Sequence, residues 1–237
     1  GSCMTIDLSF ALHKNNLPKD YRPTIVSYIK YTLSKYYPKI YHDLYGTGGT
    51  IQKSFTFSVA LPKAKFQSDS MELGNSRFWV TFSSSNDFDT LLLYNAFRKD
   101  MQNPYPIANG NYMALQYLKI KPVPKITENT ITIRFLSPLV VRKHYAGEAD
   151  KYYIFEDDEF SNCLNIVTAN RLGKDVKLDV EPISPKKTVV KSFGVNIRSS
   201  LGTYKVTSDP DVLNELLLSG MGSRRSEGFG HFEIVSR

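Results

Sequence analysis

The sequence contains few of the residues that build disulfides, metal centres or membrane spans. Of its 237 residues, two are cysteine, four are histidine and one is tryptophan. Cys3 and Cys163 are too few for a disulfide framework or a cysteine-based metal site. No segment approaches the roughly 20 apolar residues that cross a bilayer, and no secretory leader pattern is visible. We therefore expect a cytoplasmic chain with no membrane association, no metal and no other cofactor, whose native start is Met4.

Positive charge and aromatic side chains are abundant. Lysine and arginine number 30 against 23 acidic residues, which gives a net charge of +7 and an isoelectric point near 9.2. This balance favours a polyanionic partner, although many proteins of similar charge bind no nucleic acid. The chain also has 15 tyrosines and 14 phenylalanines. We expect most of these rings in hydrophobic cores, with a few available for base stacking.

A glycine-rich segment near the C-terminus is the most informative motif. It reads Gly220-Met-Gly-Ser-Arg-Arg-Ser-Glu-Gly-Phe-Gly230, so two Gly-apolar-Gly units frame five residues. Glycine permits positive φ and close backbone approach, consecutive N–H groups can hold an anion, and arginine adds forked phosphate donors. A helix cap in a tight turn explains the first glycine but not the other three beside two arginines. The predicted polyanion-binding residues are Gly220, Gly222, Arg224, Arg225, Gly228 and Gly230.

The first half of the chain alternates strand and helix patterns in the order of a ferredoxin-like βαββαβ unit. The first helix begins near Pro23, and Pro38 is expected to kink or divide it. In the second helix, at 87–101, we expect a buried face made of Phe88, Leu91, Leu92 and Phe97. The predicted strands cover 5–13, 55–61, 78–82 and 112–123.

A polar segment with two prolines, Pro122–Asn129, predicts a linker. After this linker the βαββαβ plan repeats, with additional segments between its strands and helices. The predicted strands cover 130–141, 174–182, 187–195, 202–206 and 232–235, and the predicted helices cover 160–172 and 212–218. We therefore predict an α+β fold with tandem ferredoxin-like (RRM-like) domains. The first domain covers residues 4–123, the linker 124–129, and the second domain 130–237.

The C-terminal motif resembles the signature of the repeat-associated RNA-binding (RAMP) superfamily. Its Ser-Arg-Arg-Ser-x-Gly-Phe-Gly form is similar to that of the sixth CRISPR-associated protein family, the endoribonucleases that cut precursor CRISPR RNA. Phe135–Lys143 resembles the strand that opens the second domain of that family. Tyr41-His42-Asp-Leu, followed by 53–61, resembles the catalytic end of its first helix and the next strand. The resemblance implies RNA in or across a cleft between two ferredoxin-like domains.

Metal-independent RNA cleavage needs a base for the 2′-OH, a group that stabilises charge at phosphorus, and an acid for the leaving 5′-oxygen. The resemblance implies that His42 is the general base or acid, since histidine serves both roles near neutral pH. Taken alone, a histidine before the glycine-rich stretch Gly46–Thr50 also fits a solvated surface residue. The products implied are a 5′-OH and a 2′,3′-cyclic phosphate or 3′-phosphate.

Three further side chains are candidates for the catalytic site by resemblance. Lys53 corresponds to a lysine that some members use to stabilise the scissile phosphate, and the alternative is a solvated lysine at a strand end. Its separation from His42 is longer here than in compact members, because of the glycine-rich insertion. Tyr28 and Tyr31 lie near the position of a catalytic tyrosine in some members, and the alternative for both is helix packing.

Basic residues around a predicted β-hairpin are candidates for RNA binding. They are Lys186, Lys187, Lys191 and Arg198, and the resemblance implies contact with the base of a repeat stem. The alternative is a solvated strand face. Arg142, Lys143 and His144, at the end of another predicted strand, carry the same two interpretations. Phosphate contacts of this kind make affinity fall steeply with salt.

These observations predict a metal-independent endoribonuclease that cleaves CRISPR repeat RNA. Other CRISPR-associated proteins are further expected partners, and the chain is expected to be a monomer or a homodimer. One alternative is a catalytically inactive RAMP-type RNA-binding subunit of a CRISPR interference complex. Another is a generic pair of RRM-like domains, but that class carries an aromatic RNP-type strand that this sequence lacks.

Overall fold

The computed structural model describes residues 4–46 and 52–237. Cys3 and most of the predicted loop Gly46–Thr50 lie outside the described residues. The chain forms two compact units. The first comprises Gly1–Ser54, Ser58–Val123 and Ser192–Gly194, and the second comprises Phe55–Phe57, Pro124–Lys191 and Val195–Arg237.

The sheet of the first unit has the strand order β3-β6-β1-β8-β7. The central strand β1 pairs antiparallel with β6 on one side and β8 on the other. Alternate residues of β1, including Ile6, Leu8 and Phe10, are buried, as the period-two pattern predicts. The strands are β1 (Met4–Leu12), β3 (Phe55–Ala60), β6 (Arg77–Ser84), β7 (Tyr105–Ile107) and β8 (Asn111–Pro122).

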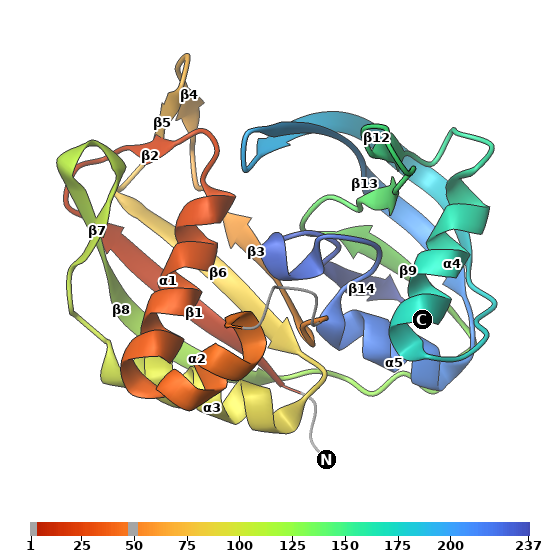
Figure 1. The fold of residues 1–237 in the computed structure, drawn as a ribbon, viewed down its shortest axis with the longest axis horizontal. Coiled ribbons are helices and arrows are strands. Elements are labelled where there is room, and N and C mark those ends of the chain that lie inside the picture. Colours follow the sequence, from red (N-terminus) through yellow and green to blue (C-terminus); the bar gives the residue numbers. More distant parts are fainter. Residues whose placement is uncertain (1–3, 47–51) are drawn as a thin grey trace. The chain divides into compact units, whose positions relative to one another are not determined.

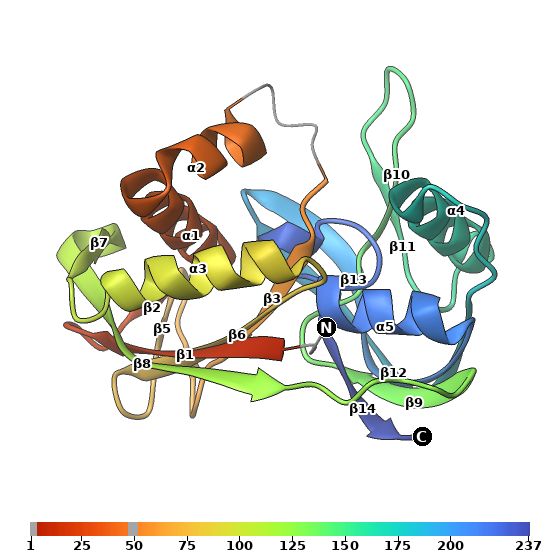
Figure 2. The ribbon, with the colours of Figure 1, turned by 90° about the horizontal axis from the view of Figure 1, so that it is seen from below.

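Three helices cover one face of this sheet, as Figure 2 shows. They are α1 (Arg22–Tyr36), α2 (Pro38–Tyr45) and α3 (Asp87–Lys99). Pro38 divides the predicted first helix as expected, because proline disrupts a helix interior but suits a first turn. Ile25, Ile29 and Leu33 are buried on α1. The order of β1, α1, β3, β6, α3 and β8 confirms the predicted βαββαβ plan.

The predicted buried face of α3 is largely wrong. Phe88 and Leu91 are 61% and 56% exposed, while the buried stripe is formed by Thr90, Leu93, Ala96 and Phe97. The helix carries apolar residues on two faces, so the 3.6-residue period alone does not select one of them. Packing against the sheet selects the stripe that contains Phe97.

Short strands decorate the first unit and were not predicted. A three-stranded sheet has the order β2-β5-β4, and a one-turn 3₁₀ helix precedes β8. Two- and three-residue strands leave no readable periodicity in a sequence. These elements are β2 (Leu17–Pro18), β4 (Lys65–Phe66), β5 (Ser70–Glu72) and the 3₁₀ helix Ala108–Gly110.

The second unit repeats the same topology. Its sheet has the order β12-β13-β9-β14, and α4 and α5 lie on one face of it (Figures 1 and 2). A separate two-stranded ribbon joins β10 to β11. The elements are β9 (Thr130–Phe135), β10 (Val141–Lys143), β11 (Lys151–Tyr153), α4 (Phe160–Leu172), β12 (Asp179–Ser192), β13 (Val195–Thr207), α5 (Pro210–Ser219) and β14 (Phe232–Ser236).

The strand predicted at 130–141 is two strands. β9 ends at Phe135, and β10 begins at Val141. Between them, the N–H groups of Leu136 and Ser137 both donate to the carbonyl oxygen of His231, at 2.8 and 3.1 Å. Pro138 has no N–H and cannot continue a ladder. The chain therefore turns here, and β10 leaves the main sheet.

The predicted strands between 174 and 206 form one long hairpin instead of three strands. Its turn is made by Phe193 and Gly194, both with positive φ. The prediction placed this turn inside a strand, because phenylalanine is uncommon at positive φ. Pro182 and Pro185 lie in β12, an edge strand, where a missing N–H is tolerated.

Within the described residues, no helix combines the length and apolarity that crossing a membrane requires. Cys163 is buried and unpaired. The same part of the chain contains no cluster of three or more histidine, cysteine or carboxylate groups with the arrangement of a metal site.

Candidate functional site

His42 lies in the last turn of α2 and is exposed. Its imidazole folds back over the end of the helix, where the N–H of Gly46 donates to the His42 carbonyl oxygen at 2.7 Å. A Cβ atom at position 46 would lie 2.5 Å from His42 Nδ1. Gly46 therefore leaves the space that the imidazole occupies.

Two lysine ammonium groups lie beside the same end of α2. Tyr45, one helical turn after His42, has Lys53 Nζ 4.7 Å and Lys30 Nζ 5.0 Å from its ring centroid. These distances are within the range of cation–π attraction. Burial, and then the neighbouring Tyr41, raises the pKa of the Tyr45 phenol, so this ring stays neutral. Tyr45 thus lies between the helical turn that carries His42 and the ammonium groups of Lys30 and Lys53.

The described interactions relate His42 and Lys53 only through Tyr45, which lies one turn after His42 on α2 and contacts the Lys53 ammonium group. The catalytic role of the two residues stays a prediction. Lys30 was missed by the sequence analysis. It approaches Tyr45 from α1, and its proximity depends on how α1 packs against α2, which no local pattern reports. Residues 47–51, which connect α2 to Lys53, lie outside the described part.

Tyr28 packs in the core of the first unit, which is the helix-packing alternative to a catalytic role. It is 1% exposed, and its hydroxyl donates to Asp100 Oδ2 at 2.9 Å. Burial and the Asp100 carboxylate raise the pKa of the Tyr28 phenol far above its usual range. Tyr31 is half-buried, its ring centroid lies 4.8 Å from that of Tyr105, and Lys35 Nζ donates to its hydroxyl at 3.2 Å. Neither tyrosine contacts His42 in a described interaction.

The glycine-rich loop is a packed element of the second unit. The N–H of Met221 donates to Gly230 O at 2.9 Å, that of Ser223 to Val140 O at 2.7 Å, and that of Gly230 to Pro138 O at 2.8 Å. The hydroxyl of Thr56 donates to Phe229 O at 2.7 Å. The expected row of free N–H groups is therefore wrong for these loop residues, because neighbouring carbonyls already accept from them.

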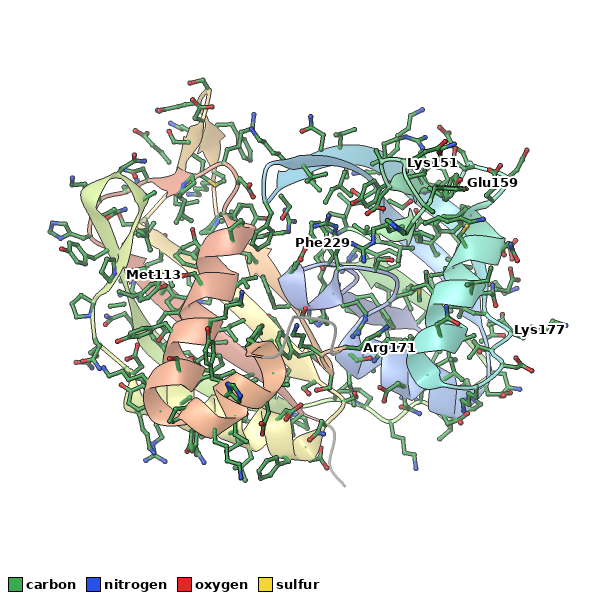
Figure 3. All side chains as sticks on the ribbon, in the orientation of Figure 1. Met113, Lys151, Glu159, Arg171, Lys177 and Phe229 are labelled. Atoms are coloured by element: carbon green, nitrogen blue, oxygen red, sulfur yellow. The ribbon has the colours of Figure 1, made fainter. Side chains whose placement is uncertain are left out.

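Close packing explains the glycines. Gly230 has a φ of 75°, and a Cβ there would lie 1.9 Å from Met221 O. Gly228 has a φ of 96°, and a Cβ there would lie 2.5 Å from the Phe57 ring. Gly220 and Gly222 are similarly enclosed. Gly222 and Gly230 thus let backbone segments touch, and Gly220 and Gly228 leave space for the side chains of Thr56 and Phe57. Phe229, labelled in Figure 3, is fully buried.

The two loop arginines bind protein groups. Arg224 donates to Glu227 Oε2 and to the Tyr152 hydroxyl, both at 2.9 Å, and its side chain is 13% exposed. Arg225 is 6% exposed and donates to Ser219 O at 2.6 Å. In this structure both guanidinium groups donate to protein acceptors, and their role as phosphate donors to RNA stays a prediction. Arginine forks suit backbone carbonyls at a helix end as well as phosphates.

A second arginine lies beside Arg225. Arg171, labelled in Figure 3, donates to Glu215 Oε1 at 3.0 Å and to the Ser219 hydroxyl. Burial, followed by the positive charge of Arg171, lowers the pKa of Arg225 to about 9. These arginines fix the C-terminal end of α5, from which the glycine-rich loop starts.

The basic residues of the β12–β13 hairpin differ in whether they form ion pairs. Lys187 pairs with Glu156 at 3.1 Å. Arg198 binds Asp157 through both terminal nitrogens, at 3.0 and 3.4 Å. Lys191 is exposed and forms no ion pair with any described residue. Among the described basic residues of this hairpin, Lys186 is also exposed and forms no ion pair, so Lys186 and Lys191 carry charge that no acidic group balances.

Two βαββαβ units in tandem, the second with a glycine-rich loop before its last strand, define a double ferredoxin-like protein. Residues 121–234 match the family model of the C-terminal part of CRISPR associated protein Cas6. A structure described as the characterization of a Cas6-related gene from Pyrococcus furiosus superposes with a TM-score of 0.83 at 20% identity, over 99% of each chain. The second unit is therefore similar to the C-terminal part of CRISPR associated protein Cas6, and the whole chain shares the fold of the Cas6-related structure.

The chain is also similar to a second solved structure and to a curated protein. A structure described as a RAMP protein binding different RNA substrates matches with a TM-score of 0.83 at 21% identity, over 98% of this chain and 100% of its own. The CRISPR system Cms protein Csm4 of Streptococcus thermophilus is 24% identical over 195 residues, which is 80% of this chain. The chain spans only 59% of the length of that curated relative.

Proposed function

We propose that this protein is a metal-independent endoribonuclease that cleaves precursor CRISPR RNA within its repeats. The observation that carries the proposal is the exposed His42 one helical turn from Tyr45, whose ring lies within 5.0 Å of the ammonium groups of Lys30 and Lys53. An exposed imidazole and two nearby positive charges supply a base and charge stabilisation for 2′-OH attack. The Cas6-type C-terminal domain supports the same reaction class.

The proposed reaction has one transfer at phosphorus. The imidazole of His42 takes the proton of the 2′-OH, and O2′ forms a bond to the adjacent phosphorus. Lys30 and Lys53 stabilise the negative charge that develops on the phosphoryl oxygens. The bond from phosphorus to O5′ then breaks, and O5′ takes a proton from a solvent water, which gives a 2′,3′-cyclic phosphate and a 5′-OH.

A non-catalytic role is the second candidate, and the match to Csm4 favours it. In this case the chain binds RNA as a subunit of a CRISPR complex, and the basic side chains serve affinity alone. The match to a structure described as a RAMP protein binding different RNA substrates is compatible with both candidates. A variant that loses cleavage but still binds RNA distinguishes the two candidates, because a non-catalytic subunit has no cleavage to lose.

The test compares two histidines of the same unit. His42→Ala and His13→Ala each remove one exposed imidazole, and single-turnover cleavage of end-labelled repeat RNA in excess EDTA is measured for both. We expect His42→Ala to slow cleavage at least ~100-fold, as removal of a general acid–base does, with unchanged RNA affinity. Equal rates for wild type and His42→Ala exclude His42 as the base. Tight binding by wild type with no cleavage of any repeat establishes the subunit role.

A further inference from the structure

The ribbon β10–β11 places two lysines directly opposite each other. Its antiparallel register pairs Val141 with Tyr153, Arg142 with Tyr152, and Lys143 with Lys151. Side chains at opposed positions have Cβ atoms about 4.5–5.5 Å apart, and like charges there are destabilising. A two-stranded ribbon has little other stabilisation of its own. Repulsion between Lys143 and Lys151 therefore lowers the stability of the ribbon in the RNA-free protein.

The two ammonium groups converge on one aromatic ring. Lys143 Nζ lies 5.2 Å and Lys151 Nζ 5.1 Å from the centroid of Tyr145. The Tyr145 hydroxyl is 2.8 Å from that of Tyr153, which fixes the ring beneath the ribbon. Tyr145 thus holds both positive charges at one place by cation–π attraction.

The acidic groups nearby do not neutralise these lysines. Asp150 is engaged by His144 at 2.6 Å and by Arg142 at 3.9 Å. The hydrogen bond from His144, and then the charge of Arg142, lowers the pKa of the Asp150 carboxyl. Within residues 4–46 and 52–237, neither Lys143 nor Lys151 forms an ion pair. Both are exposed, so their charge is directed to solvent.

The positive surface continues from the ribbon to the glycine-rich loop. Tyr152, which pairs with Arg142 across the ribbon, accepts a hydrogen bond from Arg224 at 2.9 Å. Arg142, Lys143 and Lys151 are all exposed on this surface. Positive side chains interleaved with tyrosines are the composition of single-strand nucleic-acid sites, where backbone phosphates meet the cations.

We propose that the β10–β11 ribbon binds the phosphate backbone of single-stranded RNA, with Lys143 and Lys151 each neutralising a phosphate and Tyr145 holding both ammonium groups in place. This site rests on the RNA partner proposed above and lies outside the residues assigned to cleavage. The phosphates bound by the two opposed lysines remove the repulsion between them in the RNA-free ribbon. Binding and relief of this repulsion are therefore coupled.

The test measures RNA affinity against salt by fluorescence anisotropy, with an unstructured, labelled single-stranded RNA. The variant is Lys143→Gln/Lys151→Gln, and the control is Lys177→Gln/Lys205→Gln, which removes two exposed lysines from the same unit. Lys151 and Lys177 lie well apart in Figure 3. Since each single-strand phosphate contact contributes about 0.7 to the slope of log K against log salt, we expect the ribbon variant to lose about 1.4 in slope. The control should keep the wild-type slope.

Thermal unfolding supplies a second readout. Because the lysines repel each other, Lys151→Gln should unfold at the same temperature as wild type or higher, while its RNA affinity falls. Equal salt slopes for the ribbon variant and wild type overturn the proposal. Salt-dependent binding that both double variants lose equally overturns it too, because it assigns the effect to net charge. If wild type binds no RNA at any salt concentration, the proposed function itself fails.

Discussion

Single side chains around Tyr45 determine whether the proposed chemistry is available. His42 supplies the imidazole, and Lys30 and Lys53 supply charge from two different segments of the first unit. Of these, the family resemblance named His42 and Lys53 as candidates from the residues of their motifs, although their separation is longer here than in compact members. Lys30 could not be predicted, since its distance to Tyr45 follows from the packing of α1 against α2. The partner of Arg225 could not be predicted either. Its acceptor, the carbonyl oxygen of Ser219, is available because α5 ends at that residue.

Removal of either lysine beside Tyr45 should slow cleavage more than it weakens binding. We expect Lys30→Ala and Lys53→Ala each to lower the single-turnover rate in saturating RNA by roughly 10- to 100-fold, because each stabilises transition-state charge. Lys39→Ala, an exposed lysine on α2 itself, is the control and should leave the rate unchanged. A fall in affinity with an unaltered saturating rate would assign these lysines to RNA binding alone.

Tyr28 should matter for stability and not for the reaction. Tyr28→Phe removes a buried hydrogen bond to the Asp100 carboxylate, and bonds to charged groups contribute about 2 kcal/mol. We expect urea denaturation to show a loss of about that size, with the cleavage rate unchanged. The half-buried Tyr31→Phe should change stability by less than about 0.5 kcal/mol. A slower reaction in fully folded Tyr28→Phe would restore its catalytic candidacy.

At the scale of elements, the glycine-rich loop and the helix before it act as one packed piece. The sequence predicted helix, loop and strand in the right order, and α4 was predicted with its observed bounds, since Gly173 ends it in a left-handed conformation. The partners of the loop's N–H groups could not be predicted from the sequence. Whether an N–H faces a ligand or a carbonyl depends on Pro138 and Val140, which are distant in sequence.

The crowding at Gly230 yields a prediction with a matched control. Gly230→Ala and Gly147→Ala introduce a side chain at the same φ of 75°, but a Cβ at 230 would lie 1.9 Å from Met221 O, whereas position 147 is open. We expect the control to lose about 1 kcal/mol of stability from left-handed strain. Gly230→Ala should lose roughly 3 kcal/mol or more, as clashes with backbone do. Chemical denaturation measures both, and equal losses would show that the loop backbone moves apart freely.

An ion pair in the second unit gives a pH dependence. Glu128 accepts hydrogen bonds from Arg237 at 2.7 and 2.8 Å, and these, with Thr127, lower its carboxyl pKa from 4.5 to about 2. A lowered carboxyl pKa stabilises the folded state above the unfolded pKa, and this contribution is lost as pH falls from about 4.5 to about 2. The melting temperature of Glu128→Gln should thus lie below that of wild type at neutral pH and converge with it near pH 2. Glu181→Gln, which alters an exposed carboxylate, should show no such convergence.

The whole molecule repeats one architecture with two different decorations. Both halves follow βαββαβ, and the alternation of Ile6, Leu8 and Phe10, or of Ile131 and Ile133, made that readable from sequence. The two-residue strands and the β10–β11 ribbon were not readable, because they are set by tertiary contacts. Because the two units share one strand order, the difference in their proposed roles lies in particular side chains. These are His42, Lys30 and Lys53 in the first unit, and Lys143 and Lys151 in the second.

The central claim is that the 2′-OH of the RNA is the nucleophile and that the protein's own side chains activate it. The most direct measurement is cleavage, in excess EDTA, of a repeat RNA that carries a single 2′-deoxy nucleotide at the scissile position, beside the unmodified RNA. We predict one cut in the unmodified RNA, with 2′,3′-cyclic phosphate and 5′-OH ends identified by mass spectrometry, and no cut in the 2′-deoxy RNA. Equal cleavage of both RNAs, or cleavage that EDTA abolishes, would contradict this account.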